Sequence, residues 1–345
     1  MRLPLPTLLS QPLVAYTIEI DHAFETRMPH RTAETRHSGE PRTGPLLTSY
    51  AMWANFLRHV GDGGRSLSDV REAACITDKT LHVVTNGMER WGYVTLGPGK
   101  GEARAVSPTA DGRRAAATWA PLPDEVDRRW AELRPQLRDF PLRHEGRFPS
   151  FLPIARYEAG LRAEVPDANG RGHDNLSVGE LLAQVLLAFT VEYEAESEVS
   201  LAVAANYLRV LTSEPVPVRA LPEATGTSKE AVSFATTFLA RNGLAETGTG
   251  GAAQVRLTAA GLKAQERHAR LVDEVEGRWR ERYGRDLEAL RGALEPVVGD
   301  GTLASSALAE AVAPPPGTWR AKRETPQILP HYPLVLHRGG YPDGS

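Results

Sequence analysis

The sequence is nearly without cysteine, since Cys75 is the only one among 345 residues. A single thiol cannot form an intramolecular disulfide, so other interactions must hold the fold, and this usage is typical of a reducing cytoplasm. Aromatic residues are also few, at 7% of the chain, but all hydrophobic residues together reach 41% and can build a buried core. We expect a soluble, cytoplasmic protein of about two domains, because single domains usually span roughly 100–200 residues.

The chain also lacks a large excess of either charge and any long apolar run. Its 40 Lys and Arg residues against 43 Asp and Glu residues give a net charge of −3, so binding to nucleic acid would depend on local basic patches. No segment approaches the roughly 18 uninterrupted apolar residues of a membrane span, and we expect no membrane partner. The N-terminal segment is interrupted by Pro4, Pro6 and Pro12, which predicts a short arm leading into a helix rather than a signal peptide.

Familiar catalytic and nucleotide-binding motifs are missing as well. The patterns G-x-x-x-x-G-K-[ST], G-x-S-x-G and H-E-x-x-H do not occur. The glycine-rich GPGKGE at 97–102 joins two predicted strands, so we interpret it as a hairpin tip and not as a phosphate loop. Cys75 is more consistent with a small packed residue than with a redox sensor. We therefore predict no enzymatic activity and no cofactor.

Acidic residues gather on two predicted helices and allow two interpretations. They are Glu19, Asp21 and Glu25, with His22, on the first helix, and Glu192, Glu194 and Glu196 on the second. Helical pair spacing would suit a metal or acid–base site. A second histidine is missing, however, and such residues usually pair with arginines nearby, of which Arg129 and Arg278 are candidates. We favour structural ion pairs and predict no metal.

What the sequence does contain is an internal repeat of four blocks in one order. The matched pairs are 13–25 with 186–197, 54–58 with 205–209, 74–92 with 225–243, and 124–133 with 273–282. The offset is 173 (186 − 13) for the first block, 151 (205 − 54) for the next two and 149 (273 − 124) for the last. Matches as close as ANFLR with ANYLR, repeated at nearly constant offset, indicate a duplication.

The changing offset also predicts the domain organisation. The first repeat covers 1–150 and carries about 22 extra residues (173 − 151), an arginine-rich insertion at about 26–47 that lacks apolar periodicity and is expected to be a loop. A linker at 151–175 leads to the second repeat at 176–298. A Pro-rich strap at 299–345 follows; from Pro314 on it is too rich in proline for a helix and too apolar for a free tail. We expect this tail to be extended and packed on the body, near the insertion.

Within each copy the hydrophobic pattern changes in one fixed order. Two short helical stretches come first, at 51–60 and 67–74 in copy one and at 201–211 and 218–225 in copy two. A longer third helix then begins at a capping Thr77 or Ser228 and ends at Gly92 or Gly243. The apolar face of this helix consists of Leu81, Val84 and Met88 in copy one, and of Val232, Ala235 and Leu239 in copy two.

A strand, a glycine-rich tip and a second strand follow the third helix, which predicts a β-hairpin wing in each copy. The short turns SPTADGRRA and LTAAGLKAQ then lead into a long helix. Val126 with Trp130, and Val275 with Trp279, lie one turn apart on these last helices and predict a buried face. The predicted fold class is mainly α with small β-hairpin wings, arranged as tandem winged helix-turn-helix units.

This order of elements resembles the MarR family (multiple antibiotic resistance regulators). The resemblance is strongest for TSKEAVSFATTFLARNGLAET followed by RLTAAGLKA in copy two, is looser in copy one, where Pro108 enters the turn, and covers about two thirds of the chain. MarR-like proteins are dimers whose first and last helices form a platform with two winged lobes below. The resemblance implies that this chain forms the platform internally, as a monomer with a pseudo-two-fold axis.

The resemblance further implies a transcriptional regulator that binds double-stranded DNA through its third helices and wings, with room for a small-molecule effector. The candidate DNA-binding residues are Thr77, Lys79, His82, Asn86, Lys100 and Arg104 in copy one, and Ser228, Lys229, Ser233, Thr237 and Arg256 in copy two. Because these sets differ between the copies, we expect two unequal half-sites.

A competing interpretation follows from the weak charge of the third helices. Their outward positions are close to neutral, and Val83 and Phe234 are apolar where such regulators often carry arginine. One or both lobes could therefore have lost DNA binding and kept the fold to bind a small molecule or a protein partner in the helical platform.

Overall fold

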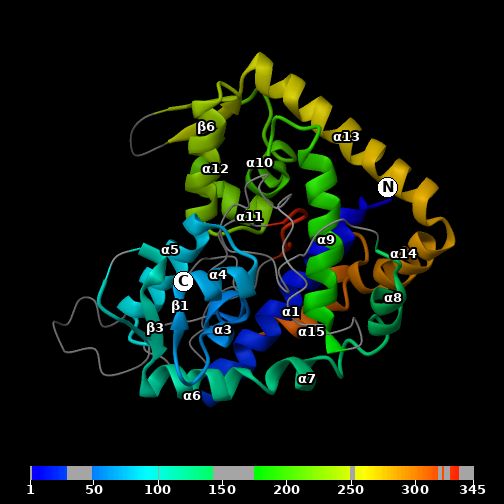
Figure 1. Cartoon of the computed structure of the whole chain (residues 1–345). Helices are drawn as coiled ribbons and strands as arrows, with labels where there is room; N and C mark the ends of the chain where they lie inside the picture. Colours follow the sequence, from blue (N-terminus) through cyan, green and yellow to red (C-terminus); the bar gives the residue numbers. More distant parts are fainter. Residues whose placement is uncertain are drawn as a thin grey trace.

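The computed structural model describes residues 2–28, 49–99, 101–142, 175–248, 253–317, 321 and 327–333, without the side chains of residues 79, 80 and 102. The described chain is mainly helical, with two antiparallel three-stranded sheets ordered β1-β3-β2 and β4-β6-β5 (Figure 1). None of the helices in these ranges has the length and apolar character needed to span a membrane. The predicted class, mainly α with small β elements, is confirmed. The insertion beyond Met28 and the linker before Asn175 lie outside the described residues.

Copy one begins with α1 (Leu5–Arg27), a helix that already includes Pro6 and Pro12. The arm before the helix is therefore only residues 2–4, shorter than the prolines predicted. Pro6 falls in the first turn, where no amide hydrogen bond is lost, whereas Pro12 lies inside the helix. The elements that follow are α2 (Tyr50–Met52), η2 (Trp53–Leu57), α3 (Arg58–Val60), β1 (Arg65–Ser66), α4 (Leu67–Ala74), α5 (Asp78–Arg90), β2 (Val94–Leu96), η3 (Gly101–Ala103), β3 (Ala105–Pro108), α6 (Ala110–Trp119), α7 (Leu122–Val126) and α8 (Arg134–Asp139).

Copy two repeats this order. Its elements are α9 (Val178–Glu194), α10 (Leu201–Leu208), β4 (Val216–Pro217), η6 (Val218–Ala220), α11 (Leu221–Thr225), α12 (Lys229–Arg241), β5 (Ala245–Thr247), β6 (Gln254–Leu257), α13 (Ala259–Tyr283) and α14 (Arg285–Val298), followed by η7 (Leu303–Ser305) and α15 (Leu308–Val312). The third helices α5 and α12 both have 13 residues and start 151 positions apart. The helical η7 and α15 differ from the predicted strap over 299–345, because Leu303, Leu308 and Val312 are buried.

The two sheets have the same register, which extends the repeat from sequence to geometry. Val106 faces Arg65 in the first sheet, and Val255 faces Val216 in the second. The edge strands β1 and β4 turn each predicted hairpin into a three-stranded sheet, and sequence analysis missed both because two-residue strands carry no periodicity. At the exit from each sheet, a glycine in the shared T-A-x-G turn is required. A Cβ on Gly112 or Gly261 would lie 1.9 Å from a backbone carbonyl oxygen.

The last helix differs between the copies. In copy two α13 runs unbroken for 25 residues. In copy one the expected long helix is interrupted after Trp119 and becomes α6, α7 and α8. Pro121, Pro123 and Pro135 explain the breaks, because proline lacks the amide hydrogen and clashes with the preceding turn of a helix. The prediction of a long last helix was therefore wrong for copy one and is confirmed for copy two.

The first helices of both copies pack against each other and form the centre of a platform. Helix α1 contacts α9, and α7, α14 and α15 pack around α1 (Figure 1). Val126, Trp130, Val275 and Trp279 are all buried there, as predicted. The ring of Phe24 in α1 stacks on Trp119 of α6 with a centroid separation of 3.9 Å.

Each copy supplies a carboxylate that accepts a hydrogen bond from the first helix of the other copy, and these contacts stabilise the platform. The backbone N–H of Val178 at the start of α9 donates to Asp127 of copy one at 3.1 Å, and that of Leu5 at the start of α1 donates to Glu276 of copy two at 2.9 Å. Both acceptors are buried. A carboxylate at a helix N-terminus accepts an otherwise unpaired N–H and interacts favourably with the helix dipole. Because Pro4 offers no side-chain cap to α1, Glu276 supplies the missing acceptor.

The acidic residues of the first helices are structural, as predicted. Arg129 donates to Glu19 at 2.6 Å, and Arg278 donates to Glu196 at 2.6 Å. Asp21 accepts the N–H of Tyr50 at 2.7 Å, and its counterpart Glu194 accepts the N–H of Leu201 at 2.9 Å. A search of the described residues finds no group of three or more metal-binding side chains.

The last described segment of the C-terminal strap, residues 327–333, is not helical and packs on copy two. The side-chain amide of Asn206 in α10 accepts the backbone N–H of Tyr332 at 3.0 Å and donates to the carbonyl oxygen of Tyr332 at 3.1 Å. Gln11 of α1 donates to the carbonyl oxygen of Leu329 at 3.1 Å. The ring of Tyr332 meets His268 of α13 edge to face, and His268 also contacts the hydroxyl of Tyr193 at 2.8 Å. The strap thus joins the platform to the second lobe.

We predict that Glu276→Ala strongly destabilises the protein. Glu276 pairs with Arg291 at 2.7 Å, and the side chain of Arg291 is 0% exposed. Removing one partner of a buried pair costs roughly 3–5 kcal/mol when the charge left behind has no other partner. Arg291 keeps Glu295 at 3.0 Å, so we expect the lower end of this range. The matched control is Glu288→Ala, which removes pairs to Arg2 and Arg280 that are about half exposed and should cost no more than about 1 kcal/mol. Urea unfolding measures both, and equal losses would contradict the proposed role of Glu276.

A second prediction concerns acid. Burial lowers the pKa of His268 to about 4. In the unfolded chain this histidine has its ordinary pKa of about 6.5 and is protonated at a higher pH than in the folded protein. The free energy of unfolding should therefore fall as pH drops from about 6.5 to about 4, by roughly 3 kcal/mol from this group. His268→Gln should remove that part of the pH dependence in urea unfolding. His82→Gln, at an exposed histidine, should leave it unchanged. Identical pH dependence in all three proteins would contradict the prediction.

Candidate nucleic-acid interface

Two lobes extend from the platform, lobe one from α2 to β3 (residues 50–108) and lobe two from α10 to β6 (residues 201–257). Figure 1 shows both sheets on the side of the molecule away from α8 and α14. The apolar core of lobe one is continuous with that of the platform. Lobe two has a cluster of its own, which contains Leu208, Val232 and Leu257. The predicted apolar faces of both third helices are buried in these cores.

In lobe one, α5 turns a mixed polar face outward. His82 and Asn86 are exposed, and Thr77 just before the helix is half-buried. Asp78 in the first turn pairs with Arg71 of α4 at 2.7 Å, which neutralises one acidic group on this face. The side chain of Lys79 and the whole of Lys100 lie outside the described residues.

In lobe two, α12 presents Lys229, Ser233 and Thr237 to solvent. Ser228, predicted as a DNA-binding residue, is only 4% exposed. Its hydroxyl accepts the N–H of Ala231 at 3.1 Å and caps the helix, so it is withdrawn from the surface. Thr237 donates its hydroxyl to the carbonyl oxygen of Ser233 at 2.8 Å. Its methyl group therefore remains the more available part of that side chain.

The arginines of both hairpins are held by neighbours. Arg104 donates to the carbonyl oxygen of Gly97 at 3.1 Å and is half-buried. Arg256 donates through Nε and Nη2 to Glu246 on the adjacent strand, at 3.0 and 2.7 Å. Both predicted phosphate contacts are thus engaged within their own sheets. The pair between Arg256 and Glu246 is about half exposed, so breaking it costs no more than about 1 kcal/mol.

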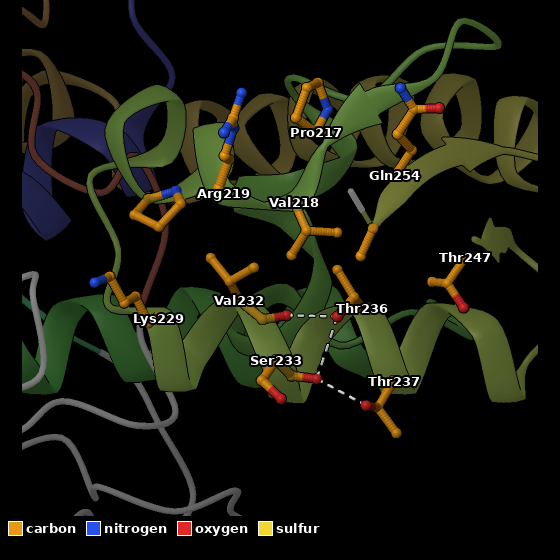
Figure 2. Close-up of a pocket in the computed structure, with 12 residues that line it drawn as sticks. Pro217, Val218, Arg219, Lys229, Val232, Ser233, Thr236, Thr237, Thr247 and Gln254 are labelled. Atoms are coloured by element: carbon orange, nitrogen blue, oxygen red, sulfur yellow. Dashed lines mark hydrogen bonds between the residues drawn. The ribbon is translucent and has the colours of Figure 1, made fainter. Parts of the chain in front are cut away.

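A hollow of about 690 Å³ lies between α12 and the sheet of lobe two (Figure 2). Its floor is apolar, with Val218 and Val232 directed into it. Cationic groups at its rim come from Lys229 and from Arg219 in η6. Sequence analysis did not select Arg219, because it assigned that residue to a short second helix rather than to the rim beside the third. Both side chains are exposed.

Each third helix also exposes one large apolar side chain at the same position. Val83 is 48% exposed and Phe234 37% exposed, and they are the large hydrophobic residues found exposed in the described ranges. They stand 151 residues apart, at the offset that relates α5 to α12. Every other apolar position of these helices in the described set faces its core or is partly covered.

A comparison of the chain with models of known protein families and with curated proteins finds no match.

The turn between the second and third helices is left-handed in both lobes but is occupied by different residues. Cys75 adopts φ 51° in lobe one, and Gly226 adopts φ 68° in lobe two. In lobe two the strap lies against this turn, and a Cβ on Gly226 would be 2.5 Å from the carbonyl oxygen of Ile328. Thr227 next to it contacts the hydroxyl of Tyr207 at 2.8 Å, and burial raises the pKa of that tyrosine. The turn before α12 therefore packs against the strap on one side and against Tyr207 of the lobe-two core on the other.

We predict opposite tolerance of alanine at these two equivalent positions. Gly226→Ala should lower the free energy of unfolding by at least about 1–2 kcal/mol, because a side chain is strained at positive φ and would also displace the strap. Cys75→Ala should change it by less than about 0.5 kcal/mol, since a Cβ is already accommodated there. Thermal and urea unfolding of the two variants check this, and a harmless Gly226→Ala would contradict the packing of the strap.

Proposed function

We propose that this protein is a DNA-binding transcriptional regulator in which two MarR-type winged helix-turn-helix lobes share one internal platform. The carrying observation is the geometric equivalence of α5 and α12. Both have the same length, follow a left-handed turn, expose a largely polar face and lie beside an antiparallel sheet of identical register. A helix of this kind fits the major groove of B-DNA, which is about 12 Å wide, and an adjacent hairpin can reach the phosphate backbone.

The proposed contacts differ between the lobes. In lobe one, Asn86 has the amide that bonds adenine in a bidentate manner, and His82 lies one turn before it. In lobe two, Lys229 and Arg219 at the rim of the hollow would bind phosphates. Arg256 would exchange Glu246 for a phosphate, which the weak exposed pair allows. Because the outward residues of the lobes differ, the preferred site should be non-palindromic and should bind one chain.

The competing proposal is that the fold has lost DNA binding and takes up a small molecule or a partner in the platform. Most residues of α1 and α9 are buried in the platform, whereas both third helices present polar side chains to solvent. The exposed faces are therefore our reason for favouring the regulator over the binding module.

The function is tested by binding of the purified chain to a duplex pool of random sequence and to the site selected from it. We expect log affinity to fall linearly with log salt concentration, with a slope of about −0.9 for each phosphate contact. The double variant Arg219→Ala, Lys229→Ala should flatten that slope by about 2 and weaken binding to all sequences alike.

The matched control is Arg270→Ala, Arg285→Ala, which removes the same charge from exposed positions of α13 and α14. It should leave the slope nearly unchanged. Absence of duplex binding at low salt, or equal effects of the two double variants, would refute the proposed interface.

A further inference from the structure

Val83 and Phe234 raise a question that general DNA binding does not answer. An exposed apolar side chain gains nothing in the free protein, because the hydrophobic effect stabilises only surface that is removed from water. Both lobes nonetheless place such a side chain in the middle of the outward face of the third helix. Most other outward positions have diverged, and the two faces retain this apolar side chain together with an exposed arginine two turns later, Arg90 or Arg241.

The size of these apolar spots argues against a protein partner. A stable protein–protein interface buries about 800 Å² on each side and has an apolar centre built from several residues. In the described part of each third helix, a single large hydrophobic residue is exposed. One side chain surrounded by polar groups matches a target of the size of a methyl group.

The neighbours of these residues indicate what carries the methyl group. Asn86 lies three residues after Val83 and offers both a donor and an acceptor, which matches the N6 and N7 atoms of adenine. Thr237 lies three residues after Phe234 and has its hydroxyl committed to the Ser233 carbonyl oxygen. In the major groove the C5-methyl group of thymine is the one apolar feature of a base-pair edge, and it stands beside the adenine atoms of the same or the next pair.

We propose that Val83 and Phe234 are specificity residues that each contact the C5-methyl group of a thymine in the major groove. This inference rests on the proposed function and deepens it. Each half-site then contains a thymine under the centre of the third helix. The larger Phe234 ring covers more of the base-pair edge than Val83 does, so the two lobes differ in how strongly they depend on that thymine.

The test is replacement of each thymine of the selected site, one at a time, by deoxyuridine. This substitution removes the methyl group and keeps the base pair. We expect one thymine in each half-site at which affinity falls about three- to fivefold, as the loss of one buried methyl group implies. Phe234→Ala should abolish this sensitivity in one half-site and preserve it in the other, and Val83→Ala should do the reverse. Both side chains are exposed, so the variants should fold, which circular dichroism and thermal unfolding verify.

Glu230→Ala is the matched control, because it changes an exposed residue one turn before Phe234 on α12 and should leave uracil sensitivity intact. Binding of the selected duplex without any uracil-sensitive position overturns the thymine assignment and leaves the regulator intact. Unchanged sensitivity in the alanine variants overturns it as well. Failure to bind any duplex overturns the regulator itself, so the two failures are distinguishable.

Discussion

The arrangement of this molecule depends on two buried carboxylates, Asp127 and Glu276, that each accept the first N–H of the other copy's leading helix. The two residues are related by the same offset as their surrounding blocks, so the contact is reciprocal between the copies. Burial raises the pKa of Asp127, while hydrogen bonds from Tyr16 and Val178 and the charge of Arg134 act against that change. Burying such groups is costly unless each is paired, and here the pairing joins the copies. These two hydrogen bonds fix how the first helices α1 and α9 lie in the platform.

The copies have diverged most where the platform meets the lobes. In copy one the prolines after Trp119 break the last helix, and the core of lobe one runs continuously into the platform. In copy two an unbroken α13 carries a lobe with a separate apolar cluster, and the strap at 327–333 closes the side of that lobe through Asn206 and Gly226. In a homodimer, both subunits have the same sequence and must pack against each other with the same surface. Two copies joined in one chain can differ in sequence, so each copy can acquire its own packing contacts.

The outward faces of the lobes have diverged in polar chemistry but not in geometry. Equal helix lengths and identical strand registers keep α5 and α12 in the same relation to their sheets. Lobe one offers His82 and Asn86, whereas lobe two offers Lys229 and hydroxyl groups. The hairpin arginines lie in internal contacts, whereas Lys229 and Arg219 at the rim of the hollow, and Arg241 at the end of α12, are exposed in lobe two.

The sequence by itself determined the duplication, the order of the elements and the apolar faces of the third helices, because these depend on local periodicity, caps and turn residues. It also indicated the ion pairs of Glu19 with Arg129 and of Glu196 with Arg278, since both arginines lie in or beside the matched blocks. That Asp21 and Glu194 instead accept backbone N–H groups was decided by the tertiary structure. Only the tertiary structure decided that Ser228 is buried, that Arg219 joins the rim beside α12 and that β1 and β4 complete the sheets. Those features depend on contacts between segments far apart in the chain, which leave no periodic trace. The same reason explains why the strap's position on lobe two, and the need for glycine at position 226, could be established only after folding.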